Sequence, residues 1–213
     1  MENYKRYGRI AGVLLLINTI ITVYNSIYGY MQAGGTAAWL VYVFSSIPWI
    51  LSILLSVGLI TDNIVLARVS VIVDLILGGL SLIIIWILGS STYTDRIGIL
   101  MLVSSVIPIL IWLFILLGLF NRGKKARAFC LVAFGIEIAY VLASYCYSIF
   151  EAGDISSAIH NLINNSSWPQ LIVSLISTIA FCAAIWFLGL YLQNRPSAKS
   201  HRVYDASAAQ PQD

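Results

Sequence analysis

Six long apolar stretches constrain the fold of this chain more than any other feature. Each holds 19 to 24 residues, and about 20 apolar residues are enough for a helix to cross the ~30 Å hydrocarbon core of a bilayer. Hydrophobic residues make up 60% of the chain and charged residues only 10%. The sequence therefore predicts an all-α, polytopic membrane protein with six transmembrane helices. We expect these spans at Ile10–Tyr28, Ala37–Ile60, Val69–Leu88, Ile97–Phe120, Ala128–Phe150 and Gln170–Leu192.

The segments between these spans are short, and they exclude several classes of protein. A soluble domain needs ~50 residues or more, so no separate catalytic or nucleic-acid-binding domain is expected. His160 and His201 both lie outside the spans, which argues against an intramembrane haem or His-Glu metal site. No lysine falls inside a span, so a retinal Schiff base is excluded. We expect no cofactor, and no enzyme class is recognised.

Positive charge is distributed very unevenly among the connections. Arg96 is the one basic residue of twelve in an odd-numbered connection; the others precede the first span, follow the last, or lie between spans two and three or four and five. Cytoplasmic loops of membrane proteins carry such an excess of lysine and arginine. We therefore expect three hairpins with both termini cytoplasmic, in the plasma (inner) membrane. The isoleucine-rich composition favours a bacterial source.

The sequence contains an apparent internal repeat with a period of 59 residues. Arg9, Arg68 and Arg127 each open an odd-numbered span, which predicts units at 9–67, 68–126 and 127–192 within one membrane domain, residues 1–192. Because each unit returns to its own side, the copies would be parallel. The alternative is that any six-span protein places arginine at the inner edge of its helices. Residues 193–213 read as a disordered cytoplasmic tail.

Two acidic residues lie inside predicted spans. Glu137 is ten residues beyond Arg127, or about 15 Å along a helix, which places it close to the midplane, whereas Asp74 is shallower. A charge at such depth costs about 2.5–3.5 kcal/mol on insertion scales. Together with Asn18, these acids are expected to form a polar interior stripe that binds a ligand or an ion. Glu137 would then be uncharged or bound to a cation; the alternative is hydrogen bonding between helices.

Prolines interrupt two even-numbered spans near mid-depth. Pro48 and Pro108 cannot donate a backbone hydrogen bond, and we expect both to act as hinges. Neighbouring serines are available to satisfy the freed carbonyls and to line a ligand site; the alternative is a kink that only serves packing. These serines are Ser45, Ser46, Ser104 and Ser105, and Tyr140 is a further candidate to line a cavity for an apolar ligand.

Two hypotheses about function follow from these patterns. The first is a small transporter or ligand-binding membrane subunit with a proton- or cation-linked site at Glu137. The second is a non-catalytic accessory, immunity-type or structural membrane protein, in which the same polar residues organise helix packing or contact a partner's spans. The expected partners are the lipid bilayer, a small-molecule or cation ligand, and a partner membrane subunit. Cys130, Cys146 and Cys182 lie within spans and are expected to serve packing.

Overall fold

The computed structural model describes residues 3–33, 38–89, 96–152 and 168–196, and this part of the chain is all-helical. The long apolar stretches form six helices in the order that the sequence predicts. Four of them, α1, α3, α5 and α7, are long and apolar enough over their described residues to cross a membrane. The bounds are α1 Asn3–Ala33, α2 Ala38–Ile60, α3 Ile64–Gly89, α4 Arg96–Phe120, α5 Gly123–Ala152 and α7 Trp168–Asn194.

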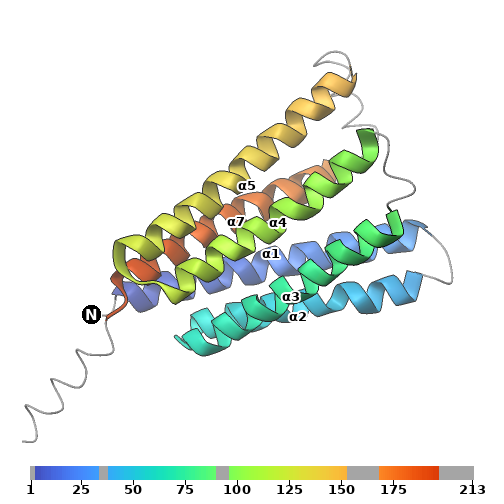
Figure 1. Cartoon of the computed structure of the whole chain (residues 1–213). Helices are drawn as coiled ribbons and strands as arrows, with labels where there is room; N and C mark the ends of the chain where they lie inside the picture. The colour runs from blue at the N-terminus through green and yellow to red at the C-terminus, as the bar shows by residue number, and fades with distance from the viewer. Residues whose placement is uncertain (1–2, 34–37, 90–95, 153–167, 197–213) are drawn as a thin grey trace, which may run out of the picture.

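The contacts among the six helices close into a ring, which Figure 1 shows from the side. Each helix packs against the next one along the chain, and α7 packs against α1, which is the most extensive contact between any two helices. A smaller contact joins α4 to α7. The helices are gathered at the end that holds the start of α1, and they spread apart towards the other end. The first and last helices of the chain therefore lie side by side.

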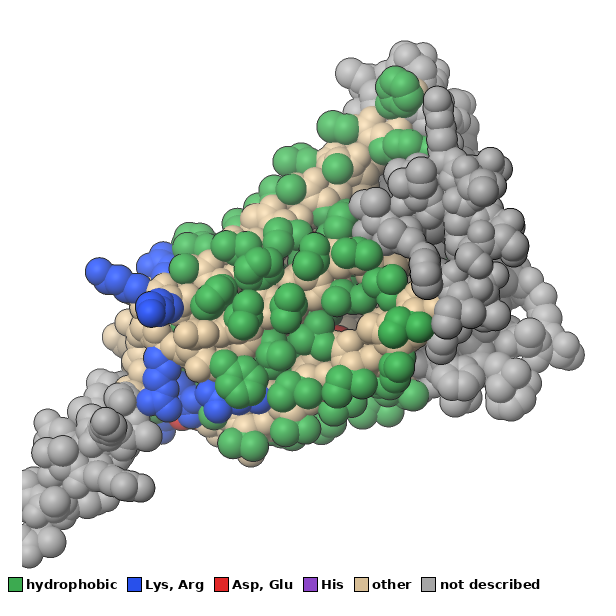
Figure 2. Space-filling model, viewed as in Figure 1, with side chains coloured by type: hydrophobic (Ala, Val, Ile, Leu, Met, Phe, Trp, Pro, Cys, Tyr) green, Lys and Arg blue, Asp and Glu red, His purple; other side chains and the backbone are tan. Residues whose placement is uncertain are grey.

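Basic side chains gather at the end where the helices converge, which we call the basic end (Figure 2). It comprises the start of α1, the α2–α3 and α4–α5 turns, and the end of α7. Hydrophobic side chains cover the flank of the bundle that Figure 2 shows. The exposed lysines and arginines of the basic end are Lys5, Arg6, Arg9, Arg122, Lys124 and Lys125.

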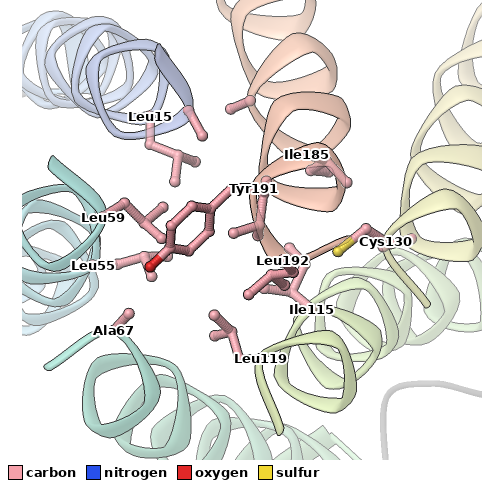
Figure 3. Close-up of a cluster of buried hydrophobic side chains, with 14 of the residues drawn as sticks. Leu15, Leu55, Leu59, Ala67, Ile115, Leu119, Cys130, Ile185, Tyr191 and Leu192 are labelled. Atoms are coloured by element: carbon pink, nitrogen blue, oxygen red, sulfur yellow. The ribbon is translucent and has the colours of Figure 1, made fainter. Parts of the chain in front are cut away.

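Among the side chains that the structure describes, the buried core lies next to the basic end, and Figure 3 shows part of it. Leu55 and Leu59 of α2 belong to the same buried cluster as Ile115 and Leu119 of α4. Tyr191 reaches from α7 across the interior towards α2, and its side chain is fully buried. This part of the ring is thus filled with side chains.

The turn between α2 and α3 is a Schellman motif with an aspartate in the left-handed position. Asp62 has a φ of 58°. The N–H of Asn63 donates to the carbonyl of Gly58 at 2.7 Å, and the N–H of Asp62 donates to that of Leu59 at 3.4 Å, which is the pattern of that motif. The Asn63 side chain then accepts from the N–H of Leu66 at 3.1 Å and caps the start of α3. The chain thus reverses direction within three residues.

Four side chains join the first and last helices to the α2–α3 turn; we call them the Asp62 cluster. The Tyr191 hydroxyl donates to Asp62 Oδ1 at 2.5 Å, and the Tyr4 hydroxyl donates to Asp62 Oδ2 at 3.2 Å. Arg195 Nε lies 3.7 Å from Oδ1, and the rings of Tyr4 and Tyr191 stack with their centroids 6.1 Å apart. The cluster therefore joins α1, the α2–α3 turn and the end of α7.

Two of the three arginines spaced by 59 residues make similar contacts. Arg68 donates from Nε and Nη2 to the carbonyl of Leu119, at 3.0 and 2.8 Å. Arg127 donates from Nη1 to Oε1 of Gln193 at 2.9 Å. Arg68 thus contacts the end of α4 within its own predicted unit, whereas Arg127 contacts the end of α7 one residue beyond its unit. Arg9 is exposed and makes no such contact within the described residues. The threefold repeat stays a prediction.

The end of α7 differs from the expected tail. The helix continues to Asn194, and Arg195 joins the Asp62 cluster, although disorder was expected from residue 193. The reason is that Tyr191 and Arg195 dock on the α2–α3 turn and hold this segment against the bundle. Residues 197–213 lie outside the described part of the chain.

Candidate functional site

A cavity of about 500 Å³ lies between α2, α3 and α4. It brings together four of the residues that the sequence marks as candidates: Pro48 of α2, Asp74 of α3, and Ser105 and Pro108 of α4. Its volume falls within the range of ~300–1,000 Å³ that is typical of small-molecule sites. We therefore take this cavity as the candidate ligand site.

The position of Asp74 follows from the helical periodicity of α3. Ala67, Ser70 and Val71 form the buried face of this helix next to the basic end. Asp74 comes seven residues after Ala67 and four after Ser70, and residues at such spacings share one helix face. Its carboxylate therefore extends the interior face of α3 beyond the packed core, at the point where the cavity begins.

The two prolines lie on opposite helices of the cavity wall. Pro48 is inside α2 and Pro108 is inside α4, and both line the cavity. Each removes one backbone hydrogen bond from its helix because proline has no N–H. Each of these two helices therefore lacks one backbone hydrogen bond beside the cavity.

The cavity wall is mostly apolar. Asp74 is its acidic residue, and the carboxylate makes no hydrogen bond or ion pair within the described part of the chain. Trp112 lines the same cavity and packs edge-on against Phe181 of α7, with the ring centroids 6.0 Å apart. An aromatic ring and a carboxylate are therefore presented to the same space.

The rim of the cavity is exposed and apolar. Ile47 and Leu80 line it with 38% and 50% of their surface accessible. Figure 2 shows a hollow among the hydrophobic side chains of the flank, and the red of an acidic side chain is visible at its bottom. The cavity is thus reached from the apolar flank of the bundle, between the helices.

The other predicted polar residues lie at different helix contacts. Asn18 Oδ1 accepts from the Ser177 hydroxyl at 2.6 Å, which joins α1 to α7. Glu137 is half-buried on α5 and lies close enough to Cys182 of α7 for an electrostatic interaction. Neither lines the cavity, so the stripe expected from Asn18, Asp74 and Glu137 is not gathered at one site.

Four further candidates are placed as follows. Tyr140 is half-buried on α5, outside the cavity, and its backbone carbonyl accepts from the Ser144 hydroxyl at 2.9 Å. The side chains of Ser45, Ser46 and Ser104 lie outside the described part of the structure. Their predicted role at the cavity therefore stays a prediction.

The sequence analysis did not identify two hydroxyl groups that lie next to Asp74, on its side towards the basic end. Ser52 of α2 and Ser70 of α3 line a small void that also contacts Asp74 and Trp112. Ser52 is in turn joined to Thr19 of α1, with 2.6 Å between their hydroxyl oxygens. The spacing of Ser70 and Asp74, four residues apart on one helix, was the available signal.

Comparison with protein families, with characterised proteins and with solved structures finds no match to this chain. Among the described residues, no group of three or more His, Cys, Asp and Glu side chains is placed to hold a metal ion. The chemistry of the site is therefore argued from the cavity itself.

Proposed function

We propose that this chain is an integral membrane protein of six spans that binds a small apolar ligand carrying one positive charge. The ligand occupies the cavity between α2, α3 and α4, and Asp74 is its counter-ion. The protein acts as a transporter or as the ligand-binding subunit of one. The observation that carries the proposal is a carboxylate without a hydrogen-bonding or ionic partner in the described structure, at the wall of an apolar cavity of about 500 Å³.

The membrane part of the proposal rests on length, composition and charge. Four helices are long and apolar enough to cross a bilayer over their described residues, and α2 and α4 have 23 and 25 residues. The basic end would face the cytoplasm, since lysine and arginine are enriched there in membrane proteins. With six spans, both termini lie on that side.

The ligand class follows from the cost of an isolated charge. A carboxylate in an apolar membrane interior is unfavourable unless it is paired or protonated. A ligand cation supplies the missing charge, and the apolar wall covers the rest of the ligand. Trp112 also lines the cavity, and an aromatic ring attracts a quaternary ammonium group. A doubly charged or strongly polar ligand would leave its remaining polar groups unpaired in this cavity.

A binding experiment tests this proposal directly. Benzyltrimethylammonium is titrated into the purified protein in nanodiscs of zwitterionic lipid, and heat is measured by isothermal titration calorimetry. We expect Asp74→Asn to weaken binding at least tenfold, because it removes the charge and keeps the size of the side chain. Glu137→Gln is the matched control, since Glu137 is also a half-buried acid but lies outside the cavity.

Three results would contradict the proposal. If neither variant changes the affinity, Asp74 is not the counter-ion. If only Glu137→Gln weakens binding, the site lies at α5, where the sequence favoured it. A wild-type protein that binds no member of a series of alkyl- and benzylammonium ions would favour the accessory role, in which Asp74 serves helix packing.

A further inference from the structure

A second, much smaller void lies next to the ligand cavity, on its side towards the basic end. It measures about 10 Å³ and is lined by Ser52, Ser70, Asp74 and Trp112 together with three aliphatic side chains. This is close to the smallest space that one water molecule occupies. Asp74 and Trp112 line both this void and the larger cavity, so the two spaces share a wall.

The hydroxyl protons around the void are already used elsewhere. Ser70 donates to the carbonyl of Leu66 at 2.8 Å. Thr19 donates to the carbonyl of Leu15 at 2.8 Å, so in the 2.6 Å pair between Thr19 and Ser52 the proton comes from Ser52. A hydroxyl group has a single proton and two lone pairs. Both serine oxygens therefore remain available to the void only as acceptors.

The void is consequently a site of acceptors around one negative charge. Ser70 and Asp74 are four residues apart on α3, which separates their Cβ atoms by about 5–6 Å and leaves room for a bridging particle. Ser52 approaches from α2. A water molecule has two protons for these three groups and leaves the charge unbalanced. A single hard cation in the void would meet oxygens of all three side chains and would cancel the charge.

The size and charge of the site select the cation. One carboxylate and two neutral hydroxyls balance a charge of +1, whereas a divalent ion would leave a net charge in a low-dielectric interior. Oxygen donors suit hard cations, and a space of one water molecule accepts Na⁺ more readily than the larger K⁺.

We propose that Na⁺ binds in this void between Asp74, Ser52 and Ser70. Because the same carboxylate faces the ligand cavity, Na⁺ and the cationic ligand exclude each other. This second statement rests on the proposed function, whereas the Na⁺ site itself does not. Binding of the ligand on one side of the membrane would then release Na⁺, and the reverse exchange would release the ligand.

The Na⁺ site is tested by thermal unfolding in NaCl and in KCl at equal ionic strength. An ion that binds only the folded protein raises the melting temperature, so we expect a rise of a few degrees in NaCl relative to KCl for the wild type. Ser70→Ala and Asp74→Asn should remove this difference. Ser56→Ala should keep it, since Ser56 is also a buried serine that donates to a backbone carbonyl, and it lines neither space.

Equal melting temperatures of the wild type in the two salts would overturn the Na⁺ site. So would a Ser70→Ala variant that retains the full difference between NaCl and KCl. Ser70→Ala keeps the volume of the side chain apart from one oxygen, so this test stands even if Asp74→Asn fails to fold.

The exclusion of one cation by the other is tested by titrating benzyltrimethylammonium at rising NaCl, with KCl holding the ionic strength constant. We expect the apparent dissociation constant to rise at least fivefold in the wild type and to stay constant in Ser70→Ala. Constant affinity in the wild type, together with a Na⁺-dependent melting temperature, would overturn the exclusion and leave the Na⁺ site. Absence of ligand binding would overturn the proposed function alone, because the melting experiment does not use the ligand.

Discussion

Substitutions of Asp62 separate two contributions to stability at the basic end. Its carboxylate accepts hydrogen bonds from Tyr4 and Tyr191, and its backbone holds a φ of 58°, where side chains other than glycine are unfavourable. Alanine removes the bonds and is less favourable than aspartate in this backbone conformation, which Asp and Asn adopt more readily than other residues with a Cβ. Glycine removes the bonds and adopts this conformation without a steric cost. Asparagine tolerates this backbone conformation and keeps one acceptor oxygen.

The magnitudes follow from the burial of the partners. Tyr191 is fully buried, and leaving its hydroxyl unpaired costs about 1–3 kcal/mol. An alanine at this φ adds about 1–2 kcal/mol. We therefore expect Asp62→Ala to lower the free energy of unfolding by about 3–4 kcal/mol, which sums the two terms. Asp62→Gly should lower it by about 2 kcal/mol, the first term alone, and Asp62→Asn by about 1 kcal/mol, because asparagine keeps one acceptor.

Unfolding in mixed micelles of rising SDS content, followed by tryptophan fluorescence, measures these differences. The order is the test: alanine should be the least stable variant, then glycine, then asparagine. Equal stability of the alanine and glycine variants would show that the left-handed backbone carries no cost. A glycine variant as stable as the wild type would show that the Asp62 cluster contributes nothing to the fold.

Two further predictions concern helix contacts and topology. A Cβ on Gly12 would lie 2.6 Å from the carbonyl oxygen of Ser56, so Gly12→Ala should destabilise the protein by about 1–3 kcal/mol in the same assay. Gly79 has open space around it, so Gly79→Ala should be neutral or slightly stabilising. Equal effects of the two substitutions would place the α1–α2 contact elsewhere. In a cysteine-free background, Lys125→Cys should react with a membrane-impermeant maleimide only after permeabilisation and Ser91→Cys in intact cells, and the reverse pattern would invert the proposed topology.

The sequence predicted the helices well because hydropathy reports their apolar length. It placed their ends less accurately. The first span was expected from Ile10, but α1 begins at Asn3, and α5 begins at Gly123 rather than near Ala128. An apolar stretch ends at the first charged residue, whereas backbone hydrogen bonding continues through lysine and arginine, which are good helix formers. The helices therefore extend into the charged segments.

The candidate site was predicted only in part. The sequence analysis favoured Glu137 over Asp74 because Glu137 lies deeper along its helix. Depth along one helix does not reveal which side chains of the neighbouring helices face the acid. The structure gathers Asp74 with Pro48 and Pro108, because α3 lies between α2 and α4 in the ring. The Asp62 cluster was missed altogether: the bond between Asp62 and Tyr191 spans 129 residues, and local sequence patterns carry no signal for such a contact.

Closure of the ring by α1 and α7 has a consequence for biosynthesis. The most extensive helix contact joins the first helix to the last, so α1 leaves the ribosome long before its main neighbour exists. At about 5–20 residues per second, roughly 10–30 s separate the synthesis of the two helices. During this interval Asn18 lacks Ser177, its partner in the finished bundle. In the membrane protein that we propose, α1 therefore stays without its main neighbour until the last helix has been made.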